Sequence, residues 1–470
     1  MLGLILFLSF FQMMHISFYG MPVYPSAIYL LFTQMHEVTG TLFNELQLFI
    51  RPSLIVVTGL IIIYFTNKIF PPKQTNPVIG IFFILYLIYN PVRTYLTGNT
   101  WGRQPSTQEL MGVNIYLSSS YFLGKILPYK LSSKNQIDKK DSVTYEKIDS
   151  FKGNIIFVIG ESLSSNHLSL FDYPLNTTPY LKSLKDDANF FAHRAISSGV
   201  STDIAVGFLM NNTFGLSGQN DIILGNHCLF KLAKKSGFET TFYSSQSQEQ
   251  LRYITNSICP KSIDHYQNIK DLDPDILNVN AADDDHLLKY IDEDLKTSQH
   301  FYILHQRGSH SPYHLRYKEE NKFFDSTGVY KKDRLNHYNN SVVEFDQFMK
   351  KLIDKIKLSP IPTIMIYVSD HGEALGVDGI WGHAALKKPS IEIPLLIYKH
   401  KTDLELNFSK VPTHLEVSLF ISKLLGHKSN IEFPLKNYQI LGNDMDGFAG
   451  YLDLKFNEEG EIESMKRMDL

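Results

Sequence analysis

The sequence has few cysteines and no excess of either charge, and each absence excludes a class of protein. Cys228 and Cys259 are the two cysteines among 470 residues, which excludes a cysteine-based zinc cluster and a disulfide-rich scaffold. The 45 Lys and Arg residues nearly balance the 48 Asp and Glu residues. A nucleic-acid partner and an acidic tail are therefore not expected. The sequence has no internal repeat and no low-complexity tract, so its chemistry must be sought in local motifs.

The two cysteines leave one question open. A bridge between Cys228 and Cys259 would close a loop of roughly thirty residues, and such a bridge is allowed if the domain lies outside the cytoplasm. Two buried free thiols are the alternative, and the sequence does not choose between them.

Long apolar runs are concentrated near the N-terminus, at residues 2–19, 53–70 and 78–92. Runs close to eighteen residues approach the length that crosses a bilayer. The first run could instead be a signal peptide, but no basic stretch precedes it and no small-residue cleavage site follows. We therefore expect a transmembrane helical region over residues 1–96, with about three spans and an interfacial segment at 20–52.

The orientation of these spans is predicted from the link at 67–76, which carries Lys68 and Lys73. Basic residues favour the cytoplasmic side, although Arg51 and Arg93 lie near the opposite ends of the flanking runs. The remainder of the chain is then expected outside the cytoplasm. Residues 97–150 are expected to form helices on the membrane surface followed by a polar linker.

Residues 151–470 are predicted to form an α/β domain. Short apolar runs of β type occur at 154–159, 239–243, 300–304, 363–368 and 392–398, and stretches of helical pattern separate them at 229–235, 284–295 and 338–356. Strands that alternate with helices indicate a doubly wound, mostly parallel sheet covered on both faces. Ligands of such sheets bind beyond the carboxyl ends of the strands.

Polar residues follow two of these runs directly. Glu161 comes after the run at 154–159, and Asp370 and His371 come after the run at 363–368. Carboxylate oxygens and an imidazole nitrogen suit zinc, although polar residues also commonly end strands and an Asp can simply cap a helix.

Two histidines and a group of hydroxyls complete the candidate site. His310 in HQRGSHSP and His383 in GIWGHAAL lie in glycine-containing loops. Ser201 and Thr202 in SGVSTD open a helical pattern. A hydroxyl in that position is usually a cap, but it can also attack phosphorus when a metal lowers its pKa.

The order GES, SGVSTD, HQRGSHSP and SDHGEALGVDGIWGH resembles the lipid A phosphoethanolamine transferases, a branch of the alkaline-phosphatase/sulfatase superfamily. NHLSLFDYPLNTTPYL and HCLFKLAKKSGFET support the resemblance, which covers nearly all of the soluble domain. It implies an alkaline-phosphatase-like fold.

The resemblance also implies a role for each site residue. Glu161, Asp370 and His371 would bind zinc, and Thr202 would be both nucleophile and fourth ligand. His310 and His383 would hold the substrate phosphate or a second zinc, and they would help to protonate the leaving group. One or two zinc ions are therefore expected.

The reaction implied is transfer of phosphoethanolamine from phosphatidylethanolamine to an envelope acceptor, either lipid A or another lipopolysaccharide or glycan group. It would pass through a phosphoethanolamine–Thr202 intermediate. The implied location is a bacterial inner membrane, with several spans and the catalytic domain in the periplasm.

The chain departs from the family pattern in three ways. Ser198 stands where the family often has a cysteine near the nucleophile, and Asp203 follows Thr202 where a small residue is usual. We count three spans where five are usual, which indicates either a shortened start or a reduced variant.

Three alternative functions make different demands on the sequence. A sulfatase would need a C/S-x-P-x-R motif, which Thr202 lacks. A phosphoglycerol transferase that uses phosphatidylglycerol would need the same residues. A non-catalytic lipid-binding regulator of envelope synthesis would have no reason to keep the whole set of Glu161, Thr202, Asp370 and His371.

Overall fold

The computed structural model describes residues 2–33, 35, 39, 45–70, 77–100, 111–132, 143–276, 283–289, 291, 295–297 and 299–468. The chain divides into two compact units. The first comprises Met1–Gln136 and Asp378–Trp381, and the second comprises Ile137–Val377 and Gly382–Leu470. Each is described separately.

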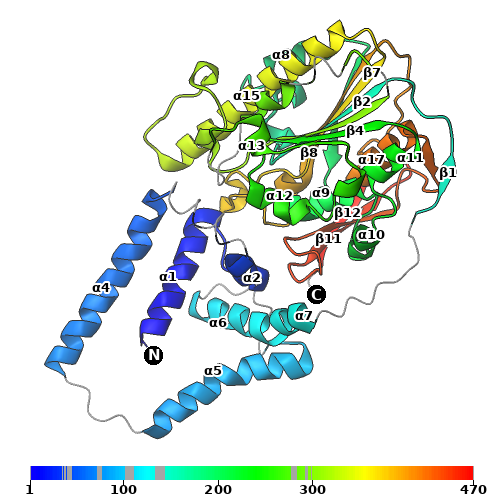
Figure 1. Ribbon diagram of the computed structural model, residues 1–470. Helices are drawn as coiled ribbons and strands as arrows, with labels where there is room; N and C mark the ends of the chain where they lie inside the picture. Colours follow the sequence, from blue (N-terminus) through cyan, green and yellow to red (C-terminus); the bar gives the residue numbers. More distant parts are fainter. Residues whose placement is uncertain are drawn as a thin grey trace. The chain divides into compact units, whose positions relative to one another are not determined.

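The first unit is helical (Figure 1). Its helices are α1 Leu2–Tyr19, α2 Pro25–Thr33, α4 Gln47–Ile69, α5 Pro77–Thr97, α6 Met111–Tyr121, the π-helix η2 Phe122–Ile126 and α7 Leu127–Ser132. All three apolar runs are helical. The helix that contains the second run, α4, begins at Gln47, which lies inside the interfacial segment predicted at residues 20–52.

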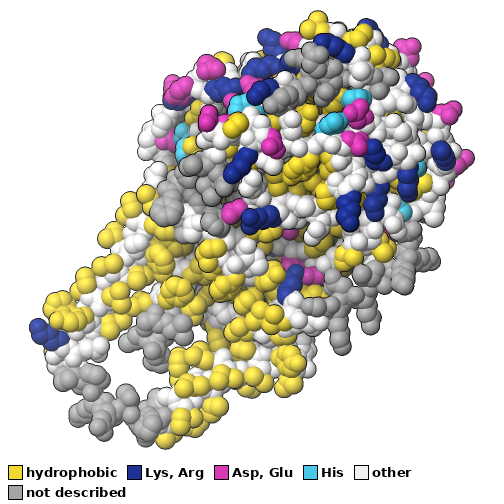
Figure 2. Space-filling model, viewed as in Figure 1, with side chains coloured by type: hydrophobic (Ala, Val, Ile, Leu, Met, Phe, Trp, Pro, Cys, Tyr) yellow, Lys and Arg dark blue, Asp and Glu magenta, His cyan; other side chains and the backbone are white. Residues whose placement is uncertain are grey.

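The helices of the first unit expose much of their apolar surface. Figure 2 shows hydrophobic side chains along α4 and α5, and large residues such as Ile62 and Phe82 are more than half exposed. A continuous exposed apolar surface calls for a cover such as lipid. Within the described residues, α4 is the helix that is both long and apolar enough to cross a membrane. A membrane anchor with several spans remains a prediction.

Buried polar side chains connect the helices of this unit. Gln12 donates from Nε2 to Asn114 Oδ1 at 2.9 Å and accepts the Val23 amide at 3.3 Å. Ser118 donates from Oγ to the Val23 carbonyl at 2.9 Å. These bonds fix α1 and α6 against the turn that precedes α2, because a buried amide side chain must keep its partners.

The second unit is built on a seven-stranded sheet in the order β3-β8-β7-β2-β6-β4-β5. The strands are β2 Asn154–Gly160, β3 Phe190–Ile196, β4 Glu239–Ser244, β5 His265–Gln267, β6 His300–His305, β7 Thr363–Ser369 and β8 Glu392–His400. β8 pairs antiparallel with both neighbours, and every other pair is parallel. The mostly parallel sheet is thereby confirmed.

Helices cover both faces of this sheet. Figure 1 shows α8 Pro179–Ser183 and α15 Tyr330–Leu358 on one face, and α9 Thr202–Met210, α11 Leu229–Lys235 and α17 His414–Leu424 on the other. Alternate residues of β2 divide between the two sides. Ile155, Phe157 and Ile159 join the core beneath α9, α11 and α17. Strands buried on both faces read as continuous apolar runs.

Several smaller elements were not predicted. β10 Asn437–Leu441, β11 Tyr451–Phe456 and β12 Ile462–Met468 form an antiparallel three-stranded sheet. β1 Tyr145–Lys147 pairs with β9 His427–Ser429. Residues 145–147 therefore belong to the second unit, whereas the sequence assigned them to the linker. Residues 133–142 of that linker lie outside the described residues, as does part of the stretch 284–295, which begins with the 3-10 helix η6 Asp284–Leu288.

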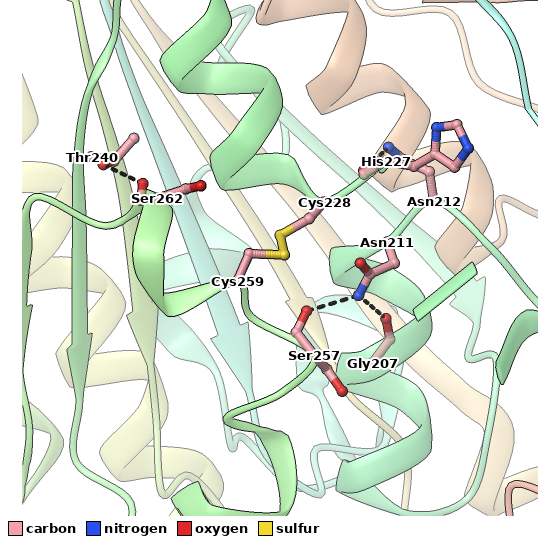
Figure 3. The surroundings of a disulfide bond; sticks show 9 residues. All are labelled: Gly207, Asn211, Asn212, His227, Cys228, Thr240, Ser257, Cys259 and Ser262. Atoms are coloured by element: carbon pink, nitrogen blue, oxygen red, sulfur yellow. Dashed lines mark hydrogen bonds between the residues drawn. A yellow bond between two sulfur atoms is a disulfide. The ribbon is translucent and has the colours of Figure 1, made fainter. Parts of the chain in front are cut away.

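Cys228 and Cys259 form a disulfide with their Cα atoms 6.5 Å apart (Figure 3). Nearby, the Asn211 side chain donates to the carbonyl oxygens of Gly207 and Ser257 at 2.9 and 2.8 Å. The open choice between a bridge and two free thiols is thus decided for the bridge. It joins the start of α11 to the segment that follows α12 Gln248–Ile254.

Candidate metal and nucleophile site

The centre of the site lies at the carboxyl ends of β2 and β7. These strands are parallel neighbours, and Gly160 is paired with Ser369. The next residue along each strand is a buried carboxylate, Glu161 on one side and Asp370 on the other. The Asp370 amide donates to the Gly160 carbonyl at 3.0 Å. The register of two strands therefore sets the two acids side by side.

Thr202 is the first residue of α9 and points its hydroxyl at these acids. Its Oγ1 donates to Glu161 Oε2 at 3.0 Å and lies 3.4 Å from His371 Nε2. Ser201 is the N-cap but makes no side-chain cap bond. Thr202 is 4% exposed, and a helix N-terminus favours negative charge. A hydroxyl there would be suited to bear the negative charge of a nucleophile.

His371 turns one ring nitrogen toward the acids. Its Nδ1 lies 3.1 Å from the Gly372 carbonyl, which can only accept, so Nδ1 carries the proton. Nε2 then presents a lone pair, 3.2 Å from Asp370 Oδ2 and 3.5 Å from Glu161 Oε1. A ring nitrogen fixed in this way by a backbone carbonyl is typical of a metal-ligating histidine.

The residues present fit a zinc ion. Ligand atoms of Glu161, Asp370 and His371 lie within 4.8 Å of one another. Asp370 Oδ2 is buried and accepts no hydrogen bond within the described part of the chain. A buried carboxylate oxygen without such a partner is costly, and a cation held between Asp370 and His371 would supply the missing partner.

Burial shifts the pKa values of these ligands. Desolvation and the neighbouring Asp370 carboxylate raise the pKa of Glu161 to about 7. Desolvation raises the pKa of Asp370 to about 6 and lowers the pKa of His371 to about 4. Two carboxylates that share a dry site resist ionising together. A divalent cation would remove that conflict.

His383 and His310 extend the site. The His383 ring stacks on His371 with centroids 4.3 Å apart, and the His310 ring centroid is 5.8 Å from that of His383. His383 Nδ1 lies 3.4 Å from Glu373 Oε2, and Glu373 Oε1 accepts from Tyr313 Oη at 2.5 Å. Although burial opposes the charge of His383, Glu373 raises its pKa to about 9. This raised pKa favours the protonated form of His383 beside the candidate ligand His371.

The structure brings together all six residues predicted from the sequence, namely Glu161, Thr202, His310, Asp370, His371 and His383. Sequence reasoning assigned no role to Glu373, although it lies in the quoted motif. It also missed Gln246, which follows β4 and donates from Nε2 to Glu161 Oε2 at 3.0 Å. The rule that ligands gather at strand ends could have identified Gln246.

Comparison with known proteins identifies the family of the chain. Residues 153–427 match the sulfatase family, and this stretch makes up more than half of the chain. A Kdo(2)-lipid A phosphoethanolamine 7''-transferase of Escherichia coli strain K12 is 28% identical over 234 residues. That match covers 47% of this chain, but the chain spans only 39% of that relative's length.

Two solved structures establish the fold. The C-terminal periplasmic domain of EcEptC from Escherichia coli, in complex with Zn, has a TM-score of 0.56 and 21% identity, and the match covers 64% of this chain and 92% of that one. The integral membrane lipooligosaccharide phosphoethanolamine transferase A of Neisseria meningitidis has a TM-score of 0.60 and 20% identity, covering 91% of this chain and 84% of that one. The alkaline-phosphatase-like fold is thereby confirmed, and the chain belongs to the sulfatase family.

Proposed function

We propose that this protein is a zinc-dependent phosphoethanolamine transferase. Its donor would be phosphatidylethanolamine, and its acceptor would be lipid A or another lipopolysaccharide or glycan group of the envelope. The observation that carries the proposal is the Thr202 hydroxyl at the N-terminus of α9, bonded to Glu161 and next to His371. Membership of the sulfatase family and the relative named for lipid A modification support it.

Glu161, Asp370 and His371 would hold the metal, with Thr202 as a further ligand. Zinc bound there supplies positive charge that favours a deprotonated hydroxyl and stabilises the phosphoryl oxygens. His383 and Glu373, together with His371, form a second group of ligand atoms within 4.8 Å. The two groups share His371, whose one lone pair faces Glu161 and Asp370. A second ion would therefore depend on Glu373 and a deprotonated His383, so we propose one zinc ion and keep a second as the alternative.

The residues of the chain divide the reaction into two steps. Thr202 would lose its hydroxyl proton to solvent when the metal is bound. In the first step, the deprotonated Thr202 Oγ1 attacks phosphorus, the bond from phosphorus to the diacylglycerol oxygen breaks, and that oxygen takes a proton from His383. In the second, a hydroxyl oxygen of the acceptor attacks the same phosphorus and returns its proton to His383, and Thr202 leaves in the deprotonated state in which it began. His310, on the far side of His383, would bind the phosphoryl oxygens. This use of one group as acid and then base follows from the reversal of the displacement.

We place the protein in a bacterial inner membrane, with several spans and the catalytic unit in the periplasm. The donor lipid stays in a bilayer, so an enzyme that uses it needs an anchor. The exposed apolar surface of α4 and α5 supports this location. The disulfide of Cys228 and Cys259 agrees with an oxidising compartment.

The test is a mass measurement on the detergent-solubilised protein after incubation with labelled phosphatidylethanolamine. We expect diacylglycerol release and a phosphoethanolamine adduct on the peptide that contains Thr202. The rate should fall on the order of a thousandfold or more in Thr202→Ala. Asp370→Asn should lose both zinc and adduct.

Ser201→Ala is the matched control, because it removes the adjacent buried hydroxyl and leaves that of Thr202. It should keep the adduct. An adduct with the mass of phosphoglycerol would instead identify a phosphatidylglycerol-dependent enzyme. Bound zinc with no adduct from either lipid would refute the enzyme and favour a lipid-binding regulator.

A further inference from the structure

His414, a residue remote in sequence from every site motif, lies between the two halves of the site. It is the first residue of α17, and its side chain is completely buried. Nδ1 lies 3.1 Å from the Ser198 amide nitrogen and 3.1 Å from Ser198 Oγ. Nε2 lies 2.9 Å from the Ser369 carbonyl oxygen. One imidazole thus joins the loop before Thr202 to the end of β7.

The partners of His414 allow one tautomer of the ring. The Ser369 carbonyl can only accept a hydrogen bond, so Nε2 carries the proton. The Ser198 amide can only donate, so Nδ1 must present a lone pair. If both ring nitrogens of His414 were protonated, Nδ1–H would face the Ser198 amide N–H, and the two donors would repel each other. The bridge is therefore made by the neutral ring and needs both nitrogen atoms.

The two partners of His414, Ser198 and Ser369, are close in sequence to the proposed catalytic residues. Ser198 stands four residues before Thr202, and β10 holds the same loop through bonds from Leu441 N to Ser198 O at 3.1 Å and from Val200 N to Leu441 O at 3.2 Å. Ser369 precedes Asp370 and donates from Oγ to the His371 carbonyl at 3.0 Å. The two chain segments that contribute the nucleophile and two metal ligands therefore meet at His414.

We infer that His414 is a positioning residue, which holds the loop of Thr202 at a fixed distance from the strand end that carries Asp370 and His371. The expected effect of His414 on catalysis rests on the proposed function. The expected ordering of residues 198–202 rests only on the hydrogen bonds of His414. Loss of the bridge leaves the buried Ser198 amide and Ser369 carbonyl unpaired, and such groups force the backbone to move or admit water.

The expected effect is on the chemical step. A displacement of about 1 Å in a reacting group costs on the order of a hundredfold in rate. His414→Leu should therefore lower kcat by about that factor and leave the KM for the donor lipid within about twofold. His414→Gln should restore most of the rate, because an amide offers an acceptor oxygen and an N–H donor on one planar group.

His427→Leu is the matched control. His427 is also buried, but it lies on β9 and not at the site. Its Nε2 is 3.2 Å from both the Leu232 carbonyl oxygen and Ser236 Oγ. This variant should lower Tm without lowering kcat. Each full-length variant would be compared with wild type for Tm, zinc content, kcat and KM with phosphatidylethanolamine. Hydrogen exchange of the backbone amides 198–205 would be measured as well.

The exchange measurement separates this inference from the proposed function. In His414→Leu, we expect the amides 198–205 to exchange at least about tenfold faster, with protection kept in His414→Gln and His427→Leu. Unchanged exchange in His414→Leu, or faster exchange with a wild-type kcat, would overturn the inference. Equal losses of kcat in the Leu and Gln variants at equal loss of Tm would also overturn it, since the role would then be purely structural.

Two further cases remain decidable. If wild type transfers nothing from the lipid, the proposed function fails, and the exchange comparison alone decides the bridge. If His414→Leu does not fold, His414→Asn replaces it, because its shorter amide can reach one of the two partners but not both. A folded Asn variant that keeps both loop protection and kcat would overturn the inference, whereas loss of either relative to the Gln variant supports it.

Discussion

Glu161 and Asp370 are paired acids in a buried site, and this pairing makes metal binding compete with protons. Metal ligands must be deprotonated to bind. Because the pKa of Glu161 is raised to about 7 and that of Asp370 to about 6, both acids hold protons at mildly acidic pH when no metal is bound. The pKa of His371 is lowered to about 4, so its imidazole is neutral over the same pH range.

We therefore expect zinc binding to release protons in a pH-dependent way. At pH 6, Glu161 is mostly protonated and Asp370 about half protonated, so one zinc should displace roughly one to one and a half protons from these two acids, in addition to the proton that Thr202 would release at either pH. At pH 8 the release from these two groups should approach zero. The affinity should accordingly increase from pH 6 to pH 8. Calorimetric titration in buffers of different ionisation enthalpy measures the proton count directly.

Glu161→Gln provides the comparison for this prediction, because it keeps the shape of the side chain and removes its titration. Proton release at pH 6 should fall by nearly one in this variant, with weaker binding. Equal proton release at pH 6 and pH 8 in the wild-type protein would contradict the shifted carboxylates.

Individual site residues were predictable where a motif ends a strand. Glu161, Asp370 and His371 follow apolar runs, and the neighbouring positions of β2 and β7 bring them together. Gln246 and His414 were not found, because their importance depends on contacts with residues 85 and 216 positions away. For Gln246 the sequence shows only its place after a strand, and for His414 it shows no signal at all.

At the level of elements, the loop after β6 depends on a close approach between two backbones. Gly308 has a φ of +51°, and a Cβ added there would lie 2.6 Å from the Glu161 carbonyl oxygen. The Ser309 amide donates to that oxygen at 3.0 Å, and the Gly308 amide donates to Asp284 at 3.0 Å. A side chain at position 308 would push the loop away from Glu161, the proposed metal ligand.

Gly308→Ala should therefore lower both stability and zinc affinity. A positive φ alone costs on the order of 1–3 kcal/mol in a residue with a side chain, and the clash with Glu161 adds to that cost. We expect zinc affinity to fall by about tenfold or more. Chemical denaturation of the metal-free protein and zinc titration measure the two effects.

Gly328→Ala is the control for the cost of a positive φ by itself. Gly328 has a φ of +76°, and its added Cβ would meet no atom of the described residues within 4 Å. It should lose stability without losing zinc affinity. The same loss of affinity in both variants would show that strain anywhere in the domain weakens the site, and the specific role of Gly308 would be wrong.

The predictability of elements depended on how they are buried. β2, β4, β6 and β7 are almost entirely buried and read as apolar runs. β12 is mostly exposed, and β1 is a three-residue strand that exists because it pairs with β9. Such strands are defined by their partners, so composition did not reveal them. The antiparallel direction of β8 was likewise invisible, because buried strands of either direction are apolar.

On the scale of the whole molecule, the two units differ in how much apolar surface they expose. The second unit has its own sheet, a continuous core on one face of that sheet and a disulfide. The first unit exposes apolar side chains along α4 and α5. A unit with its own core is expected to fold alone, whereas exposed helices of this kind need a lipid or detergent cover.

We therefore expect a chain of residues 143–470 to be soluble and to unfold cooperatively with the zinc stoichiometry of the full protein. It should release diacylglycerol from short-chain phosphatidylethanolamine dissolved in water at a rate within about tenfold of the full chain. Release from the same headgroup in vesicles should fall by a far larger factor, because binding to a bilayer makes encounter with the lipid effectively intramolecular. Thermal melts, metal analysis and the two donor assays make the comparison. If the shortened chain were as active on vesicles as the full chain, residues 1–142 would have no part in reaching the donor, and the proposed anchor would be wrong.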